Sequence, residues 1–199
     1  MSSSRIILSK HSWLDVFDID SDLLPDVSLF HNLWKLHPED HSYIKIWGNL
    51  QQVPRWQQSY LRNYRFSGVV SEALPLPKEF SPYLKWANNL GYGEFNEVLV
   101  NWYQDGNNYI GSHSDDESAL VPGSSILTLT FCAEGLPRKF RIRSKVTKVI
   151  IEDLETTNGK VIVMGGRCQK EFKHEIPKVT GAKASQMGAR ISVTMRQFA

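Results

Sequence analysis

The stretch Glu97-Val98-Leu99-Val100-Asn101-Trp102-Tyr103 decides the fold class, because its side chains follow the two-residue period of a β-strand. Similar segments follow at residues 126–132, 140–143, 161–164 and 190–197. Turn signals separate them, at Asp105-Gly106, Pro122-Gly123, Asn158-Gly159 and Gly165-Gly166. Short strands divided by such turns predict a sandwich, a barrel or a jelly roll.

Two helices are predicted upstream of these strands. The first covers residues 24–36, where apolar side chains recur at helical spacing before Pro38. The second starts with Ser81 as its cap and Pro82 in the first helical position, and Gly91 can close it. Residues 43–64 look β-like but irregular. Helices followed by strands predict an α+β chain of one domain, residues 1–199, divided into an N-terminal part (1–95) and a β core (96–199).

Composition excludes several classes of protein. The chain has 199 residues, of which 41% are hydrophobic and 22% charged, as in globular domains and unlike disordered, collagenous or coiled-coil chains. No apolar run approaches the ~18 residues of a membrane span. Cys132 and Cys168 form no CxxC motif, which predicts a reducing, intracellular setting. The net charge of +2 gives no global reason to expect a polyanionic partner, so such a case must be local.

The strongest chemical signal is His113-Ser114-Asp115. On an extended chain His113 and Asp115 point to the same side, and His174 is the other histidine of the β region. Two imidazoles and a carboxylate occupy one face of an octahedron, a set typical of non-haem Fe(II) sites for oxygen chemistry. The alternative is a charged surface turn. A rival pair, His37 and His41, is disfavoured because Pro38 interrupts a helix between them.

A second signal lies in the last predicted strand. Arg190, Ser192, Thr194 and Arg196 share one face, with no acidic residue among them. Arginine grips carboxylates through its planar fork, so an inward face of this kind indicates an acidic ligand, whereas a solvated face is the alternative. Because this strand is ~20 Å long, we expect one arginine to hold the ligand's far carboxylate and the other to orient Asp115. Asn101 and Tyr103 share another strand face and could bond into the same cavity.

In order and type these pieces resemble the AlkB family of Fe(II)- and 2-oxoglutarate-dependent dioxygenases. The resemblance covers residues 46–196 and is strongest to the nuclear branch that repairs alkylated duplex DNA, through Val53-Pro54-Arg55-x-Gln57-x-x-Tyr60 and Tyr64-x-Phe66-Ser67-Gly68. It implies a double-stranded β-helix with an N-terminal nucleotide-recognition lid. It also implies Fe(II), 2-oxoglutarate and O2 as cofactor and cosubstrates. We expect a monomer without a membrane segment, nuclear in a eukaryote and otherwise cytoplasmic.

The resemblance also implies roles for single residues. His113, Asp115 and His174 would bind iron, and Arg190 would pair with the distal carboxylate of 2-oxoglutarate. Asn101 and Tyr103 would hydrogen-bond the cosubstrate, and Arg196 would lie near its iron-binding end and Asp115. Two positions depart from the family. Ser192 replaces the usual Asn, which shortens the reach toward the cosubstrate, and Phe172 stands where Trp is common.

The implied reaction is the oxidative demethylation of 1-methyladenine and 3-methylcytosine in DNA, with release of formaldehyde. Trp47-Gly48, at a predicted hairpin tip, would wedge into the duplex in place of the flipped base. Tyr64 and Phe66 would enclose that base, and Asp116, with Glu117 beside it, would accept from its exocyclic amine at the reaction centre. Alternatives are the same chemistry on RNA or a protein side chain, and a non-catalytic nucleic-acid binder.

Local positive charge supplies the expected phosphate contacts. Residues 138–148 hold six basic side chains and no acid, and alternation with Phe140 and Ile142 predicts a strand with one cationic face that includes Arg143. Arg55 would add a basic contact from the lid. A solvated face is the alternative.

Overall fold

The computed structural model describes residues 3–66 and 69–199, without the side chains of Ile46 and Phe66. Its largest element is a main sheet of eight strands in the order β1-β2-β14-β11-β16-β9-β5-β8. Neighbours in this sheet are antiparallel, except for the parallel pair β5 and β8. The strands are β1 (Ser4–Ile7), β2 (Ser12–Asp18), β14 (Lys160–Gly166), β11 (Ile126–Cys132), β16 (Arg190–Arg196), β9 (Glu97–Tyr103), β5 (Trp56–Tyr60) and β8 (Ala73–Leu74).

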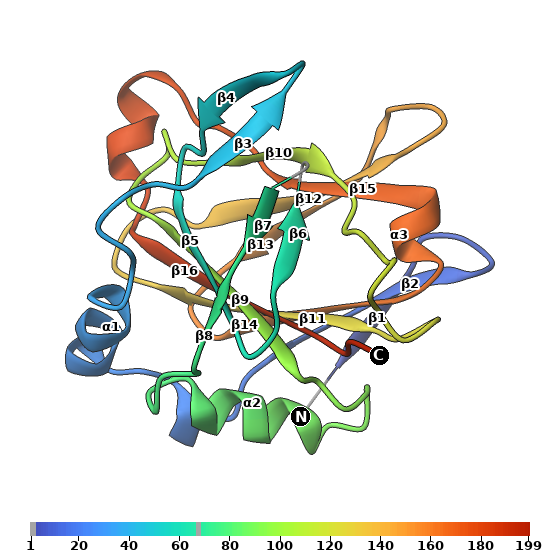
Figure 1. The fold of residues 1–199 in the computed structure, drawn as a ribbon, viewed down its shortest axis with the longest axis horizontal. Coiled ribbons are helices and arrows are strands. Elements are labelled where there is room, and N and C mark those ends of the chain that lie inside the picture. Colours follow the sequence, from blue (N-terminus) through green and yellow to red (C-terminus); the bar gives the residue numbers. More distant parts are fainter. Residues whose placement is uncertain (1–2, 67–68) are drawn as a thin grey trace.

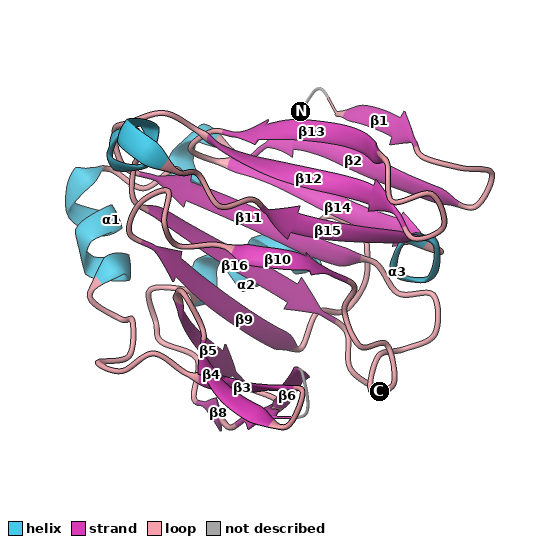
Figure 2. Cartoon of the chain, turned by 90° about the horizontal axis from the view of Figure 1, so that it is seen from above, coloured by secondary structure: helices cyan, strands magenta, loops and turns pink. Residues whose placement is uncertain are grey.

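A minor sheet of four antiparallel strands lies over the main sheet, as Figure 2 shows. Its order is β10 (Ile110–His113), β15 (Phe172–Ile176), β12 (Arg138–Ser144) and β13 (Ile150–Thr156). Two hairpins stand beside the sheets: β3 (Tyr43–Ile46) with β4 (Asn49–Gln52), and β6 (Tyr64–Phe66) with β7 (Val69–Ser71). The first hairpin projects at the top of Figure 1.

Helices cover the face of the main sheet that points away from the minor sheet (Figures 1 and 2). They are α1 (Val27–Trp34) and α2 (Ser81–Asn88), and a short α3 (Cys168–Glu171) and two 3-10 turns, Ser21–Leu23 and Gly181–Gln186, lie in connections. The Asp26 side chain caps α1 by accepting from the Leu29 amide. Trp102 of β9 donates its indole N–H to the Leu33 carbonyl at 3.0 Å, which ties α1 to the sheet.

Strand β9 shows how the sequence positions the site. All seven of its residues are buried. Val98, Val100 and Trp102 pack with the helices in one core cluster. The alternate residues face the minor sheet, so Asn101 and Tyr103 lie between the two sheets. A polar residue at a position of this central strand that faces the minor sheet therefore lies inside the sandwich.

The predicted order of helices first and strands second is wrong. Strands β1 and β2 open the chain, and β2 pairs with β14 in the main sheet, so that sheet draws strands from both sides of residue 95. The two faces of β2 are buried, with Leu14 between the sheets and Phe17 against the helices, so the strand lacks the polar alternation of a half-exposed strand.

Element boundaries differ from the predicted ones in instructive ways. The predicted cap residue Ser81 is the first residue of α2, Phe80 occupies the cap position, and the Ser81 hydroxyl lies 3.4 Å from the Pro77 carbonyl oxygen. Helix α1 begins at Val27 rather than at residue 24, because Asp26 supplies the cap.

Strands β13 and β15 were not predicted, since each mixes acidic or basic residues with short apolar runs. Across the described residues, no helix is long and apolar enough to span a membrane.

Candidate active site

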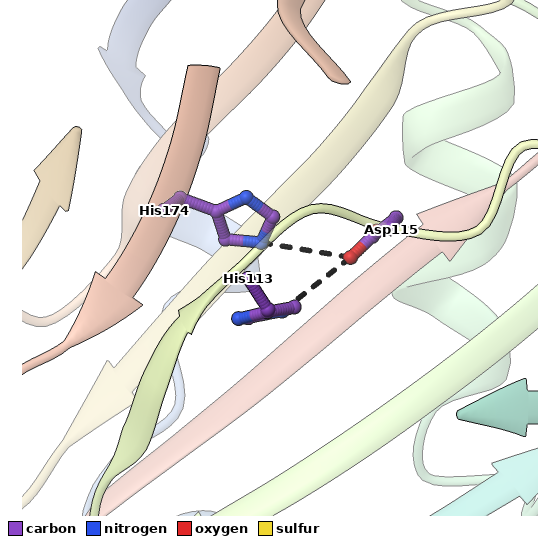
Figure 3. A group of neighbouring side chains, drawn as sticks. All are labelled: His113, Asp115 and His174. Carbon is purple, nitrogen blue, oxygen red and sulfur yellow. Dashed lines mark ion pairs between the residues drawn. The ribbon is translucent and has the colours of Figure 1, made fainter. Parts of the chain in front are cut away.

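The pairing of β10 with β15 brings two histidines together. His113 at the end of β10 lies directly opposite His174 in the register, and their ring centroids are 4.2 Å apart. Asp115 follows in the loop after β10, and its Oδ1 lies 3.5 Å from His113 Nε2 and 3.6 Å from His174 Nε2 (Figure 3). One potential ligand atom from each residue lies within 4.8 Å of the others.

Neighbouring groups hold these three residues in place. His113 Nδ1 lies 2.9 Å from the Gly111 carbonyl, which only accepts, so Nδ1 donates this bond and Nε2 is the nitrogen that faces Asp115. Asp115 donates its backbone N–H to the Gln169 side-chain oxygen at 2.9 Å. The imidazole of His174 stacks on Phe140, with 5.4 Å between ring centroids. Both imidazoles thus present Nε2 toward the same carboxylate oxygen.

The charge states of these groups suit a metal ligand set. Burial alone would raise the pKa of Asp115, but Arg196 and the two imidazoles more than offset it and hold that pKa well below its usual range. Burial lowers the pKa of His174 to about 3, so its imidazole is neutral. Asp115 Oδ1 is buried and accepts no hydrogen bond from the described residues. A buried anionic oxygen without a hydrogen-bond partner among the described residues, beside two imidazole Nε2 atoms, fits a divalent cation.

Arg190 forms the other end of the same cavity. Its side chain is 0% exposed, and Nη2 donates to the Thr130 hydroxyl at 3.0 Å, while Nε and Nη1 have no partner among the described residues. Burial lowers the pKa of this guanidinium. Its carbon Cζ lies 5.1 Å from the centre of the Tyr103 ring. A buried cation with two unused donors fits a carboxylate ligand.

Arg55 belongs to this cavity rather than to an outer basic patch. It is 4% exposed, donates from Nε to Asn101 Oδ1 at 2.7 Å, and donates from Nη2 to Gln57 Oε1 at 3.0 Å. Because Arg55 donates to Asn101 Oδ1, the Asn101 amide is oriented with its oxygen toward Arg55, and its Nδ2 group is the donor that it could offer to a ligand. The face of β16 that was predicted to point inward also lines this cavity. The polar residues around the cavity are Arg55, Gln57, Tyr64, Asn101, Tyr103, His113, Asp115, Thr128, His174, Arg190, Ser192, Thr194 and Arg196.

The predicted cationic face of β12 is largely neutralised, which corrects the sequence-based interpretation. Arg141 forms two hydrogen bonds with Asp153 of β13, at 2.7 and 2.9 Å. Arg143 donates to Glu175 of β15 at 2.8 Å. Arg138 is buried and donates to three backbone carbonyls instead of facing solvent. The acids come from neighbouring strands, which a search along one stretch of sequence does not reveal.

The predicted substrate residues lie around the cavity rather than in one group. Trp47 is 97% exposed at the tip of the β3–β4 hairpin. Tyr64 is 3% exposed, and its ring lies 4.4 Å from Arg196 Cζ. Asp116 is exposed, accepts from the Ser118 amide at 2.9 Å and borders a separate hollow. Glu117 is partly buried in the same loop. The Phe66 side chain and Ser67-Gly68 lie outside the described residues.

The structure adds two contributors that were not predicted from the sequence, and it shows what surrounds His37 and His41. Gln169 of α3 was not anticipated as a partner of Asp115, and no local pattern signals it. Glu97, in phase with Asn101 on an otherwise apolar strand, was a visible signal of a buried charge. His37 stacks on Trp56, and the His41 ring is tilted against the same indole. Their Nδ1 atoms bond to the carbonyls of Pro38 and Val53 respectively.

Comparison with known proteins agrees with this geometry. The family model for the 2OG-Fe(II) oxygenase superfamily matches residues 35–196. The chain is a 2OG-Fe(II) oxygenase. Within that superfamily its curated relatives include AlkB-family proteins, among them ALKBH2 and alkB homolog 3. The His113, Asp115 and His174 group fits the Fe(II) for which this superfamily is named.

Individual relatives give the extent of this similarity. The chain is 29% identical over 169 residues to the DNA oxidative demethylase ALKBH2 of Homo sapiens, covering 78% of this chain and 60% of that protein. It is 30% identical over 125 residues to alkB homolog 3 of Rattus norvegicus, covering 58% of this chain and 41% of that protein. The chain thus spans about 60% of the length of its ALKBH2 relative.

A solved structure titled "The structure of OsALKBH1" has the same fold. It superposes with a TM-score of 0.61 at 13% identity, covering 98% of this oxygenase and 100% of that chain. The similarity confirms the predicted jelly roll as the architecture of the two sheets.

Proposed function

We propose that this dioxygenase oxidatively demethylates 1-methyladenine and 3-methylcytosine in DNA. The relatives named DNA oxidative demethylase ALKBH2 support this class of reaction. The observation that carries the proposal is Trp47, whose indole is 97% exposed at the tip of the β3–β4 hairpin.

The geometry of this tip suits insertion between bases. Trp47 has φ 50° and Gly48 has φ 82°, so both central residues of the turn have the left-handed φ that two-residue hairpins of type I′ require. Tryptophan at positive φ is uncommon and costs backbone strain, which functional sites often contain. A large apolar ring on a tight hairpin can fill the gap that a flipped base leaves and so offset part of the unstacking cost.

A second hollow shares lining residues with both this hairpin and the cavity. A hollow beneath the hairpin is bordered by Tyr43 and Leu50 on the hairpin and by Gln57 and Tyr64 below. Gln57 and Tyr64 also line the active-site cavity. A base displaced at Trp47 would therefore reach Gln57 and Tyr64, which also border the cavity that contains His113, Asp115 and His174. In our proposal Tyr64 contacts the base together with Phe66, which lies in β6.

Asp116 is proposed to select the base. Its hydrogen bond from Ser118 lowers its pKa, so the carboxylate stays ionised at neutral pH. It shares its hollow with Tyr64, the residue that also borders the cavity. An anion at this position attracts a base made cationic by methylation and accepts from an exocyclic amine. The same proposal gives Glu117 an orienting role and Arg143 a phosphate contact, for which Arg143 would have to leave Glu175.

The chain's own residues are proposed to bind and orient the cosubstrate. Arg190 would accept the distal carboxylate of 2-oxoglutarate on its unused Nε and Nη1 donors. Asn101, Tyr103 and Ser192 line the path between Arg190 and the histidines and would donate hydrogen bonds to it. When bound, Fe(II) with 2-oxoglutarate and O2 supplies the oxidation of the N-methyl group, whose product loses formaldehyde. The apolar walls, such as Leu99 and Phe140, exclude water from this space.

The decisive experiment measures succinate and formaldehyde from a DNA duplex that carries one 1-methyladenine. Fe(II), 2-oxoglutarate and ascorbate are present, and the matching single strand and an RNA strand are tested in parallel. We expect equimolar succinate and formaldehyde from the duplex, and none from the His174→Ala variant. Consumption of 2-oxoglutarate without formaldehyde from either DNA form would contradict the proposal, and formaldehyde from RNA alone would redirect it to RNA.

A further inference from the structure

Glu97 is a buried carboxylate next to Arg196, and none of the roles described above involves it. It opens β9, its side chain is 0% exposed, and its partner in the β9–β16 register is Arg196. Glu97 Oε2 accepts a hydrogen bond from Arg196 Nη1 at 2.9 Å, and Oε1 lies 3.4 Å from the Ser59 hydroxyl. Arg196 is therefore held between two carboxylates, those of Glu97 and Asp115.

This arrangement uses every nitrogen of the Arg196 guanidinium. Nη1 binds Glu97, whereas Nε and Nη2 lie 2.9 and 2.8 Å from Asp115 Oδ2. The Tyr64 ring covers the guanidinium carbon at 4.4 Å. All of these side chains are buried. A buried triad of two anions and one cation holds its members in a single geometry, because a buried charge without its partner costs several kcal/mol.

The charges around the cavity explain why a second carboxylate is useful. Arg55, Arg190 and Arg196 are buried cations that line the cavity, and Asp115 is the acid that faces them from the described residues. Arg196 alone would cancel the charge of Asp115 and oppose a divalent cation at the histidines. Because Glu97 neutralises Arg196, that arginine can orient Asp115 without cancelling its charge.

We propose that Glu97 is a positioning residue for the metal site, which acts through Arg196 by fixing its guanidinium and balancing its charge. Asp115 thereby stays an anionic ligand with Oδ1 turned to the imidazoles. Partners of metal ligands that lie outside the coordination sphere typically change metal affinity by 10–100-fold. The role concerns the metal site and does not depend on which methylated substrate the enzyme takes.

The test measures metal affinity rather than turnover. Glu97→Gln keeps the size and one acceptor oxygen but removes the charge, and Glu97→Met removes both. Mn(II), a redox-stable substitute for Fe(II), is titrated into metal-free protein, and free Mn(II) is followed by electron paramagnetic resonance. Burial raises the pKa of Glu97 to about 7 and Arg196 opposes that rise, so the titration is run at pH 8. We expect the Kd for Mn(II) to rise about 10-fold in both variants.

A matched control separates this role from a purely structural one. Asp15→Asn removes a buried carboxylate of β2 that pairs with Arg5 outside the cavity. We expect it to lower the melting temperature and to leave the Kd for Mn(II) unchanged. An unchanged Kd in a folded Glu97 variant, or an equal rise in Asp15→Asn, would overturn the proposal. Either Glu97 variant suffices if the other does not fold, and failure of both to fold would assign Glu97 to folding instead.

Discussion

Arg196 binds a single oxygen of the Asp115 carboxylate. Nε and Nη2 of the arginine lie 2.9 and 2.8 Å from Oδ2, whereas Oδ1 lies 3.5 and 3.6 Å from the two histidine Nε2 atoms. The two-pronged contact fixes the rotation of the carboxylate, so one oxygen is reserved for the arginine and the other for the metal. The last strand of the chain therefore sets the orientation of a ligand located 81 residues earlier.

Arg196→Lys tests whether the arginine keeps one oxygen of Asp115 for itself and leaves the other for the metal. A lysine keeps the positive charge but offers one compact ammonium in place of two parallel donors, so the carboxylate is free to rotate. We expect the Kd for Mn(II) to rise by about 10-fold. Arg138→Lys is the control, since Arg138 is equally buried but binds backbone carbonyls. An unchanged Kd for Arg196→Lys would show that charge alone positions Asp115.

Arg190→Met should raise the melting temperature of the ligand-free protein and weaken its binding of 2-oxoglutarate. Arg190 is fully buried and contacts no carboxylate in the described structure, so its charge destabilises the protein when no ligand is bound. We expect the variant without ligand to melt at a higher temperature than the wild type, and to bind 2-oxoglutarate about 100-fold more weakly. Thermal unfolding and isothermal titration calorimetry measure these two effects.

Arg138→Met provides the opposite pattern as a control. It removes three hydrogen bonds to backbone carbonyls, at 2.8, 2.9 and 2.7 Å, but leaves in place Arg190 and its contacts with Thr130 and the Tyr103 ring. We expect a lower melting temperature and unchanged affinity for 2-oxoglutarate. Tight binding of 2-oxoglutarate by Arg190→Met would exclude the assigned role of Arg190.

Trp47→Ala tests the proposed wedge. Because the indole is 97% exposed, its loss removes no core packing, and we expect an unchanged melting temperature. Release of formaldehyde from methylated duplex DNA should fall by at least 10-fold, because nothing then fills the gap left by the flipped base. Activity on the single strand should survive. Leu50→Ala, at an exposed apolar residue of the same hairpin, should have a smaller effect. Equal losses on duplex and single strand would rule out a wedge.

The inward face of β16 could be predicted from sequence because alternation is a local property. Arg190, Ser192, Thr194 and Arg196 all line the cavity, as their spacing indicates. The same reasoning could not find the partner of Arg196, because Glu97 becomes its neighbour only when β9 pairs with β16, 99 residues away in the sequence. The location of Arg55 was misjudged for a related reason: its partner Asn101 lies on the neighbouring strand.

Two other differences from the predictions also arise from contacts between strands. The basic run of β12 looked unpaired because its acids, Asp153 and Glu175, come from the two adjacent strands. Strand β2 could not be predicted from the sequence, because burial on both faces removes the polar alternation that marks a half-exposed strand. Its one buried acid, Asp15, pairs with Arg5 of β1 and lies close to Tyr92.

The pair of Asp15 and Arg5 predicts how stability depends on pH. Two hydrogen bonds from Arg5, both at 2.7 Å, and one from Tyr92 at 2.8 Å lower the pKa of Asp15 below its ordinary value, although burial acts in the opposite direction. A lowered folded-state pKa contributes stability above the unfolded pKa of about 3.9, and that stability is lost as the pH falls through the folded value. We therefore expect Asp15→Asn to melt a few degrees below the wild type at pH 7.

This difference should shrink as the pH falls below about 4, because protonation then removes the same charge from the wild type. Melting temperatures of both proteins between pH 3 and pH 7 measure the effect, with the exposed Asp40→Asn as the control. The control should follow the wild type at every pH. A constant difference between Asp15→Asn and the wild type over this range would mean that packing at β2, rather than the charge of Asp15, carries the stabilisation.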